Sequence, residues 1–253
     1  MKNRLPKSKI SGYPVSTGSL EEHCRLIEAG IQAKTGLWVV TLNLEMIYRA
    51  HKNRSYQKLL ESADIMVADG VPLLWLSKLK RGEPPIAGRS NGTDLTEKLL
   101  KSNIDVNIGV VGGKNPVKAI EKHAPSLLNR IYIYDREVRL SNRKATAALA
   151  ADIIKNKVEL LFLNLGVPKQ DLLARIIRSE DSSVTIIGVG GSFDILAGLK
   201  PRAPQWMQKN GLEWLFRLLL EPKRLAKRYL IHYPQAVYYL MKDIVISNFK
   251  LTE

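Results

Sequence analysis

Six short apolar runs, separated by segments with helical spacing, constrain the fold of this chain more than any other feature. Each run is rich in β-branched residues, and together they cover residues 37–43, 64–69, 106–111, 131–134, 158–165 and 184–189. Continuous hydrophobicity is typical of strands buried on both faces of a mostly parallel sheet. An intervening segment opens with Asn115 and Pro116, which suit an N-cap and a first helical position. The sequence therefore predicts an α/β, Rossmann-like fold in which helices flank a mostly parallel sheet.

The strand pattern ends near Pro204. Residues 205–253 are rich in Arg, Lys, Trp and Tyr and are predicted to be helical, with Pro222 dividing the helices because proline lacks a backbone N–H. We therefore expect an α/β domain over residues 1–204 and a helical appendage over residues 205–253. Aromatic rings interleaved with cations suit a helix at a membrane surface, although the same rings could pack on the core.

Charge and cysteine content limit the partners and the compartment. The 253 residues include 39 Lys and Arg against 24 Asp and Glu, a formal net charge of +15. This excess favours nucleic acid, phosphate-bearing small molecules or an acidic membrane surface as partners. The single cysteine, Cys24, fits a reducing compartment. No apolar stretch reaches the roughly 18 residues of a membrane span, and no signal peptide follows the basic N-terminus, so we expect a cytoplasmic protein with peripheral membrane contact.

Polar residues and glycines follow the predicted strands at their carboxyl ends, where open α/β sheets bind ligands. Any single one could be a turn glycine or a helix cap, but six strand ends together favour a binding crevice. A glycine pair before a capped helix would also let backbone N–H groups approach a phosphate. In strand order, the candidates are Thr41 and Asn43, Asp69, Gly112 and Gly113, Asp135, Gln170, and Gly190 and Asp194.

Several common nucleotide and metal motifs are absent from the sequence. There is no GxGxxG string and no Walker P-loop, which argues against an ATPase and against a nucleotide-sugar epimerase or dehydrogenase. There is also no Asp-x-Asp pair to hold a divalent ion on a donor diphosphate, so Arg, Lys and helix N-termini would have to meet that charge. The four histidines show no ligand spacing, and we expect neither a metal nor another cofactor.

Seven strings, taken in order, carry a family resemblance over nearly the whole chain beyond about residue 20. They are TLN (41–43), DIMVADGVPL (64–73), GRSNGTDL (88–95), GVPKQD (166–171), GVGGSFDILAG (188–198), KPRAPQWMQKNGLEWLFRLLLEPKR (200–224) and RY (228–229). Their order and spacing resemble the WecG/TagA/CpsF glycosyltransferase family. The resemblance implies a GT-E fold and an inverting, metal-independent transfer. The donor would be UDP-N-acetylmannosamine, its uronic acid or UDP-glucose, and the acceptor a sugar on undecaprenyl diphosphate at the inner face of the plasma membrane.

The resemblance also implies roles for individual residues. Asp69 would be the general base that removes the acceptor hydroxyl proton; the alternative is an Asp-Gly turn that ends the strand. Asp64 is the weaker carboxylate candidate because it lies at the other end of the same strand. Thr41 and Asn43 would bind substrate hydroxyls beside Asp69.

The remaining roles concern charge and the nucleotide. Arg89 would hold an acceptor phosphate or sugar, unless it is an exposed loop cation, and Gln170 and Asp194 would line the nucleotide pocket, with helix capping as the alternative for Asp194. Three arginines of the appendage would reach over the active site and bind a diphosphate, with a solvated basic face as the alternative; they are Arg217, Arg224 and Arg228.

A basic, non-catalytic nucleic-acid-binding protein is the competing hypothesis from another class. The net charge motivates it, but the sequence contains no RNP-type string or Cys/His finger, so we expect no nucleic-acid partner. A homo-oligomer stays open as an alternative to a monomer.

Overall fold

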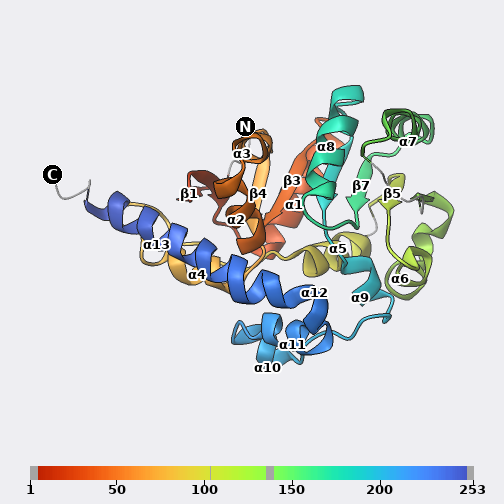
Figure 1. Cartoon of the computed structure of the whole chain (residues 1–253). Coiled ribbons are helices and arrows are strands. Elements are labelled where there is room, and N and C mark those ends of the chain that lie inside the picture. Colours follow the sequence, from red (N-terminus) through yellow and green to blue (C-terminus); the bar gives the residue numbers. More distant parts are fainter. Residues whose placement is uncertain (1–4, 103, 135–139, 250–253) are drawn as a thin grey trace.

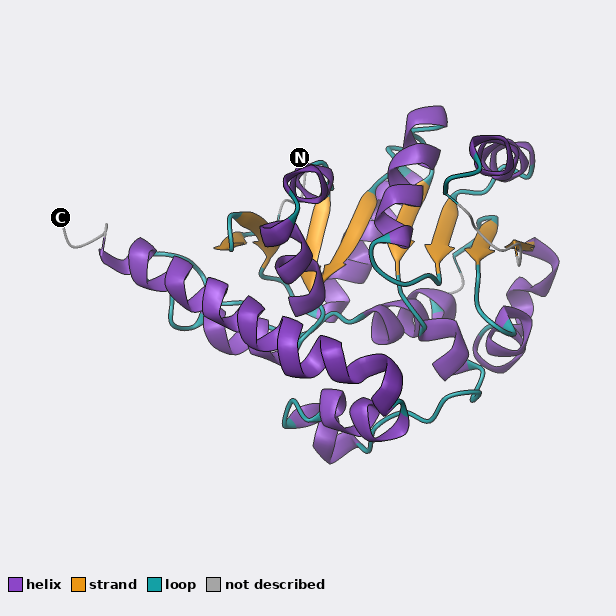
Figure 2. Ribbon diagram, in the orientation of Figure 1, coloured by secondary structure: helices purple, strands orange, loops and turns teal. Residues whose placement is uncertain are grey.

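An eight-stranded sheet forms the centre of the molecule (Figures 1 and 2). The computed structural model describes residues 5–102, 104–134 and 140–249. The strand order is β1-β2-β4-β3-β8-β7-β5-β6, and the six predicted strands are all present, as β3 to β8, and parallel to one another. The predicted α/β fold is therefore confirmed. The strands are β1 Lys7–Ile10, β2 Tyr13–Ser16, β3 Trp38–Leu42, β4 Ile65–Ala68, β5 Ile108–Val111, β6 Ile131–Tyr134, β7 Leu160–Leu163 and β8 Thr185–Gly188.

Two strands at one edge of the sheet were not predicted. β1 and β2 form an antiparallel hairpin, and β2 joins the sheet through the pairing of Val15 with Met66 of β4. Ser11 and Gly12 make the turn at φ values of 50° and 85°, as a two-residue hairpin turn with positive φ at both central positions requires. Lys7 and Lys9 in β1 and Pro14 in β2 interrupt the apolar pattern, so neither strand shows the continuous apolar run that marks the other six.

Helices cover both faces of the sheet because alternate strand residues point to opposite sides. Val39 and Val67 belong to one buried cluster, and Val40 and Met66 to the other. The α-helices before the last four are α1 Leu20–Gln32, α2 Leu44–Lys52, α3 Arg54–Glu61, α4 Val71–Ser77, α5 Gly92–Lys101, α6 Pro116–His123, α7 Arg143–Lys155, α8 Lys169–Glu180 and α9 Ser192–Leu196, with a 3-10 helix at Pro125–Arg130.

The C-terminal helices lie beyond the carboxyl ends of the strands, below the arrowheads in Figure 2. They are α10 Gln205–Lys209, α11 Glu213–Leu220, α12 Pro222–Lys227, a π-helix at Arg228–His232 and α13 Tyr233–Phe249. Pro222 begins α12, so the predicted break is confirmed. α13 packs on α2 and α4 and buries Ala236, Leu240 and Ile244 in the core cluster on that face of the sheet. The helical appendage therefore shares its core with the sheet.

Candidate active site

Asp69 lies directly after β4, beside the end of the neighbouring strand β3. Its backbone N–H donates to the carbonyl oxygen of Leu42 at 2.9 Å. The side-chain amide of Asn43 donates to Asp69 Oδ2 at 3.5 Å, while Asn43 Oδ1 accepts from the backbone N–H of Met46 and caps α2. The two parallel strand ends thus bring the predicted base and an orienting amide together. Asp64, at the other end of β4, binds Trp38 N at 2.8 Å and Arg178 at 2.6 Å.

Burial and nearby charges act on the Asp69 carboxyl in opposite directions. Burial is the largest influence and raises the pKa of Asp69 above its ordinary value. Arg217 opposes this shift, Glu213 adds to it, and Arg89 and Arg228 lower the pKa by smaller amounts. Asp69 keeps part of its surface exposed, and three guanidinium groups influence the charge of its carboxyl.

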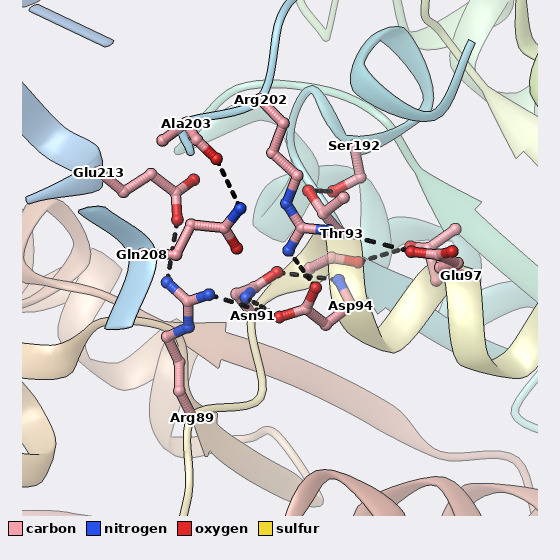
Figure 3. A network of polar contacts seen from close by, with 12 residues as sticks. Arg89, Asn91, Thr93, Asp94, Glu97, Ser192, Arg202, Ala203, Gln208 and Glu213 are labelled. Carbon is pink, nitrogen blue, oxygen red and sulfur yellow. Dashed lines mark hydrogen bonds and ion pairs between the residues drawn. The ribbon is translucent and has the colours of Figure 1, made fainter. Parts of the chain in front are cut away.

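Arg89 is held by two acids, as Figure 3 shows. Its Nη1 bonds Glu213 Oε2 at 2.9 Å, and its Nη2 bonds Asp94 Oδ2 at 3.4 Å. Glu213 also pairs with Arg217, four residues further along α11. Glu213 therefore joins Arg89, in the loop between α4 and α5, to Arg217 of the C-terminal helices.

Arg228 belongs to the π-helix that joins α12 to α13. Its Nη2 and Nε donate to the hydroxyl of Tyr233 at 2.9 Å and 3.2 Å. Its guanidinium carbon lies 5.8 Å from the ring centroid of Tyr229 and 5.4 Å from that of Tyr233, within cation–π range. π-Helical turns are rare and are frequently found at functional sites.

Arg224 differs from the other two arginines of the appendage. Its side chain is 60% exposed and pairs with Glu221, which precedes the first turn of α12. The structure places this side chain against Glu221 and solvent, and the expected role of Arg224 in binding a diphosphate stays a prediction.

The glycine turn after β5 contacts the turns that follow two other strands. Gly112 and Gly113 adopt φ values of 81° and 94°. A Cβ on Gly113 would lie 2.6 Å from Nδ2 of Asn164 and would displace that amide, and the positive φ also favours glycine there. The next residue, Lys114, donates its backbone N–H to Asp194 Oδ1 at 2.9 Å. Asn115 then caps α6 as predicted.

Other predicted site residues hold the strand ends together. The buried hydroxyl of Thr41 donates to Gly188 O at 2.9 Å and joins β3 to β8. Gln170 is also buried, and its Oε1 accepts from the backbone N–H of Gly190 at 3.1 Å. Both hydrogen bonds hold neighbouring segments together near the end of β8. Asp135 lies outside the described residues.

Sequence reasoning missed the acids that organise the arginines. Glu45 is buried, and its carboxylate bonds Arg49 at 2.6 Å and His232 Nδ1 at 2.9 Å. Arg228 Nε lies 3.9 Å from the same carboxylate. Glu45 directly follows the TLNL segment, but no spacing rule links it to partners more than 180 residues away.

Two further findings concern metals and membranes. Among the described residues, no three His, Cys, Asp or Glu side chains gather in a way that could hold a metal ion. In the same part of the chain, none of the helices combines the length and apolar character that a membrane crossing requires.

The sequence model of the glycosyl transferase WecG/TagA/CpsF family matches residues 8–249. The chain belongs to this family. It is therefore a glycosyltransferase of cell-surface polymer synthesis that acts on a sugar donor and a lipid-linked acceptor. The match includes the C-terminal helices as well as the sheet, so both belong to the family's common structure.

Proposed function

We propose that this enzyme inverts the anomeric centre of its donor and uses Asp69 as the general base. The donor is a UDP-sugar of the N-acetylmannosamine type or UDP-glucose, and the acceptor is a sugar on undecaprenyl diphosphate. The observation that carries the proposal is a carboxylate of raised pKa at a strand end, with arginines from two parts of the chain nearby. A base needs a pKa close to the working pH, and burial moves Asp69 in that direction.

The reaction is a single displacement. Asp69 takes the proton of the acceptor hydroxyl, whose oxygen forms a bond to the anomeric carbon as the bond from that carbon to the UDP oxygen breaks. Asn43 supports this role because its amide lies 3.5 Å from the carboxylate and can fix its orientation. One carboxylate suffices for this mechanism because no glycosyl-enzyme intermediate forms.

The departing UDP gains negative charge. We propose that arginines, rather than a metal ion, stabilise this charge. Arg217 and Arg228 both influence the charge of Asp69, and their guanidinium groups can form charge-assisted bonds to phosphate oxygens. We place the nucleotide over the ends of β5, β7 and β8. The turn at Gly112 and Gly113 supports this placement because it lets the backbone approach a phosphate closely.

We also propose that the enzyme works at the inner face of the plasma membrane as a peripheral protein. Exposed apolar side chains on the C-terminal helices support this, since such groups can enter the lipid interface without crossing it. They include Leu219 at 72%, Leu230 at 63% and Ile231 at 47% exposure.

The test is a screen of UDP-sugars with a prenyl-diphosphate-linked sugar acceptor in excess chelator, with product mass and anomeric configuration as readouts. We expect transfer with inversion. Asp69→Asn should bind UDP within a few-fold of the native enzyme and lose about 100-fold or more in turnover. Asp64→Asn is the matched control from the same strand. A retained anomeric configuration would refute the inverting mechanism, and a metal requirement would refute metal independence. Near-normal turnover of Asp69→Asn would refute the role of Asp69 as base.

A further inference from the structure

A cavity of about 580 Å³ is lined by residues of α4, α5 and α10 and of the loops that precede α5 and α10. We call it the α4–α10 pocket. One wall is formed by α4, which begins at Val71, two residues after Asp69. Arg89 lines the pocket and also acts on the charge of Asp69. The pocket and the proposed base therefore share one guanidinium group.

The pocket lining is strongly cationic. Four cations line it against a single acid, Asp94. That acid already binds both Arg89 and Arg202, as Figure 3 shows. Lys78 and Lys209 form no ion pair within the part of the chain that the structure describes. Arg89 also pairs with Glu213, and Arg202 lies 3.9 Å from Glu97. Among the described residues, Lys78 and Lys209 therefore supply the two cations of the lining that no acid balances, which suits a ligand with more than one negative charge.

Apolar side chains of α4 also line the pocket, on the helix whose C-cap is Lys78. They are Val71, Leu74 and Trp75, and Trp75 is 55% exposed. The turn at Gly211 packs on this wall so closely that an added Cβ would lie 3.2 Å from Val71 and 3.3 Å from Trp75. Trp206 of α10, next to the lining residue Gln205, is 60% exposed. A cationic surface thus meets an exposed apolar wall.

We infer that the α4–α10 pocket binds the diphosphate of the lipid-linked acceptor together with the first part of its hydrocarbon chain. The cations contact the diphosphate, the Trp75 wall contacts the chain, and the attached sugar extends past Arg89 to Asp69. Gln205 and Gln208 also line the pocket, but the exposed apolar surface of Trp75 suits a hydrocarbon chain better than it suits the ribose of a nucleotide. This inference rests on the proposed function and adds a location for the acceptor.

The test measures binding to the full-length protein by calorimetry, without requiring transfer. The probes are farnesyl diphosphate, inorganic diphosphate and UDP. The variant Lys78→Gln/Lys209→Gln should bind farnesyl diphosphate about tenfold or more weakly, because two charge-assisted contacts are lost. Its affinity for UDP should stay within twofold. The matched control is Lys144→Gln/Lys155→Gln, which removes the same charge from exposed positions of α7 and should leave farnesyl diphosphate binding unchanged.

Trp75→Ala separates the hydrocarbon chain from the phosphate groups. It should weaken farnesyl diphosphate binding several-fold and leave inorganic diphosphate binding unchanged. An unchanged thermal unfolding midpoint shows that each variant is folded. Equal farnesyl diphosphate affinity in the lysine variant and its control would overturn the inference. Loss of UDP affinity in the lysine variant, or displacement of farnesyl diphosphate by UDP, would assign the pocket to the donor instead.

The same variants distinguish failure of this inference from failure of the proposed function. If no UDP-sugar is transferred by the native enzyme but the binding pattern holds, the proposed reaction is wrong and the pocket assignment stands. If transfer occurs and the lysine variant keeps the native KM for the acceptor, the pocket assignment is wrong and the reaction stands.

Discussion

The charge on Asp69 depends on which arginines lie near it. Burial raises the pKa of Asp69, and among the neighbouring charges Arg217 has the largest opposing influence. A base must be ionised to accept a proton, so transfer should fall as the pH drops through the raised pKa. Arg217 therefore has a second effect beyond any contact with UDP, since it extends activity to lower pH.

This effect predicts different pH profiles for two arginine variants. Arg217→Gln removes a cation that lowers the pKa of Asp69, so the acidic limb of the kcat/KM profile should move to higher pH. Arg224→Gln is the matched control, because Arg224 is 60% exposed and pairs with Glu221. Profiles from pH 4 to 8 check this, and a limb that moves equally in both variants would contradict the placement of Arg217.

Asp171 makes stability depend on pH. It is buried in the first turn of α8, and Tyr56 donates to its Oδ2 at 2.6 Å. Burial raises the pKa of Asp171 to about 7, although the Tyr56 hydrogen bond acts in the opposite direction. Because the folded protein holds this proton more tightly than the unfolded chain, the associated stability is full below about pH 4 and is lost as the pH rises towards 7.

The prediction for Asp171 is a sloping stability difference. The free energy of unfolding of the native protein minus that of Asp171→Asn should decrease from pH 4 to 7, by about 1.4 kcal/mol per unit of pKa difference as an upper limit. Denaturant titrations at each pH measure it. Tyr56→Phe removes a group that lowers the pKa of Asp171 and should extend the slope to higher pH. A flat difference for Asp171→Asn would contradict the shift.

At the level of elements, α2 and the π-helix are joined through Glu45. Its carboxylate accepts from His232 at 2.9 Å and lies 3.9 Å from Arg228. The His232 ring also stacks on Tyr48 of α2 at 4.1 Å. α2 is the helix that Asn43 caps beside Asp69. Glu45 is therefore a positioning residue that fixes the π-helix, and with it Arg228, relative to the base.

Glu45→Gln should keep the fold and loosen this connection. We expect kcat to fall about tenfold while the KM for the UDP-sugar changes less, because Arg228 would act mainly on charge that develops in the transition state. Glu61→Gln, on the exposed surface of α3, is the matched control. If Glu45→Gln lowered thermal stability along with kcat, and Glu61→Gln showed the same fractional losses, the role of Glu45 would be purely structural.

The elements differ in how well the sequence predicts them. Strands β3 to β8 are buried on both faces, so their apolar runs stand out, and Asn115 and Pro222 mark helix starts by their own chemistry. The hairpin of β1 and β2 was missed because polar residues and Pro14 interrupt its apolar pattern. Polar strand ends predicted Asp69 and Asn43. Pairs such as Arg89 with Glu213 join residues 124 positions apart, and no local rule encodes such contacts.

At the scale of the whole molecule, the C-terminal helices have two different surfaces. One packs on the sheet and α2, where Leu240 is 1% exposed. The other carries Leu219, Leu230 and Ile231, which are 47–72% exposed. Removing these helices would therefore open the core as well as remove the outer surface. Point substitutions on the outer surface are the sharper way to examine membrane contact.

The last prediction concerns attachment to anionic vesicles. The protein has a net charge of +15, and cations near an anionic surface contribute about 1 kcal/mol each. Attachment should therefore weaken with added salt, and Leu219→Ser/Leu230→Ser should reduce it at every salt concentration because less apolar surface enters the interface. The matched control is Leu128→Ser/Ile154→Ser, two side chains exposed by 42% and 40% outside the C-terminal helices. Sedimentation with vesicles measures attachment, and UDP binding confirms the fold. If the control lost as much attachment as the test variant, or if salt had no effect, the C-terminal helices would not be the membrane contact.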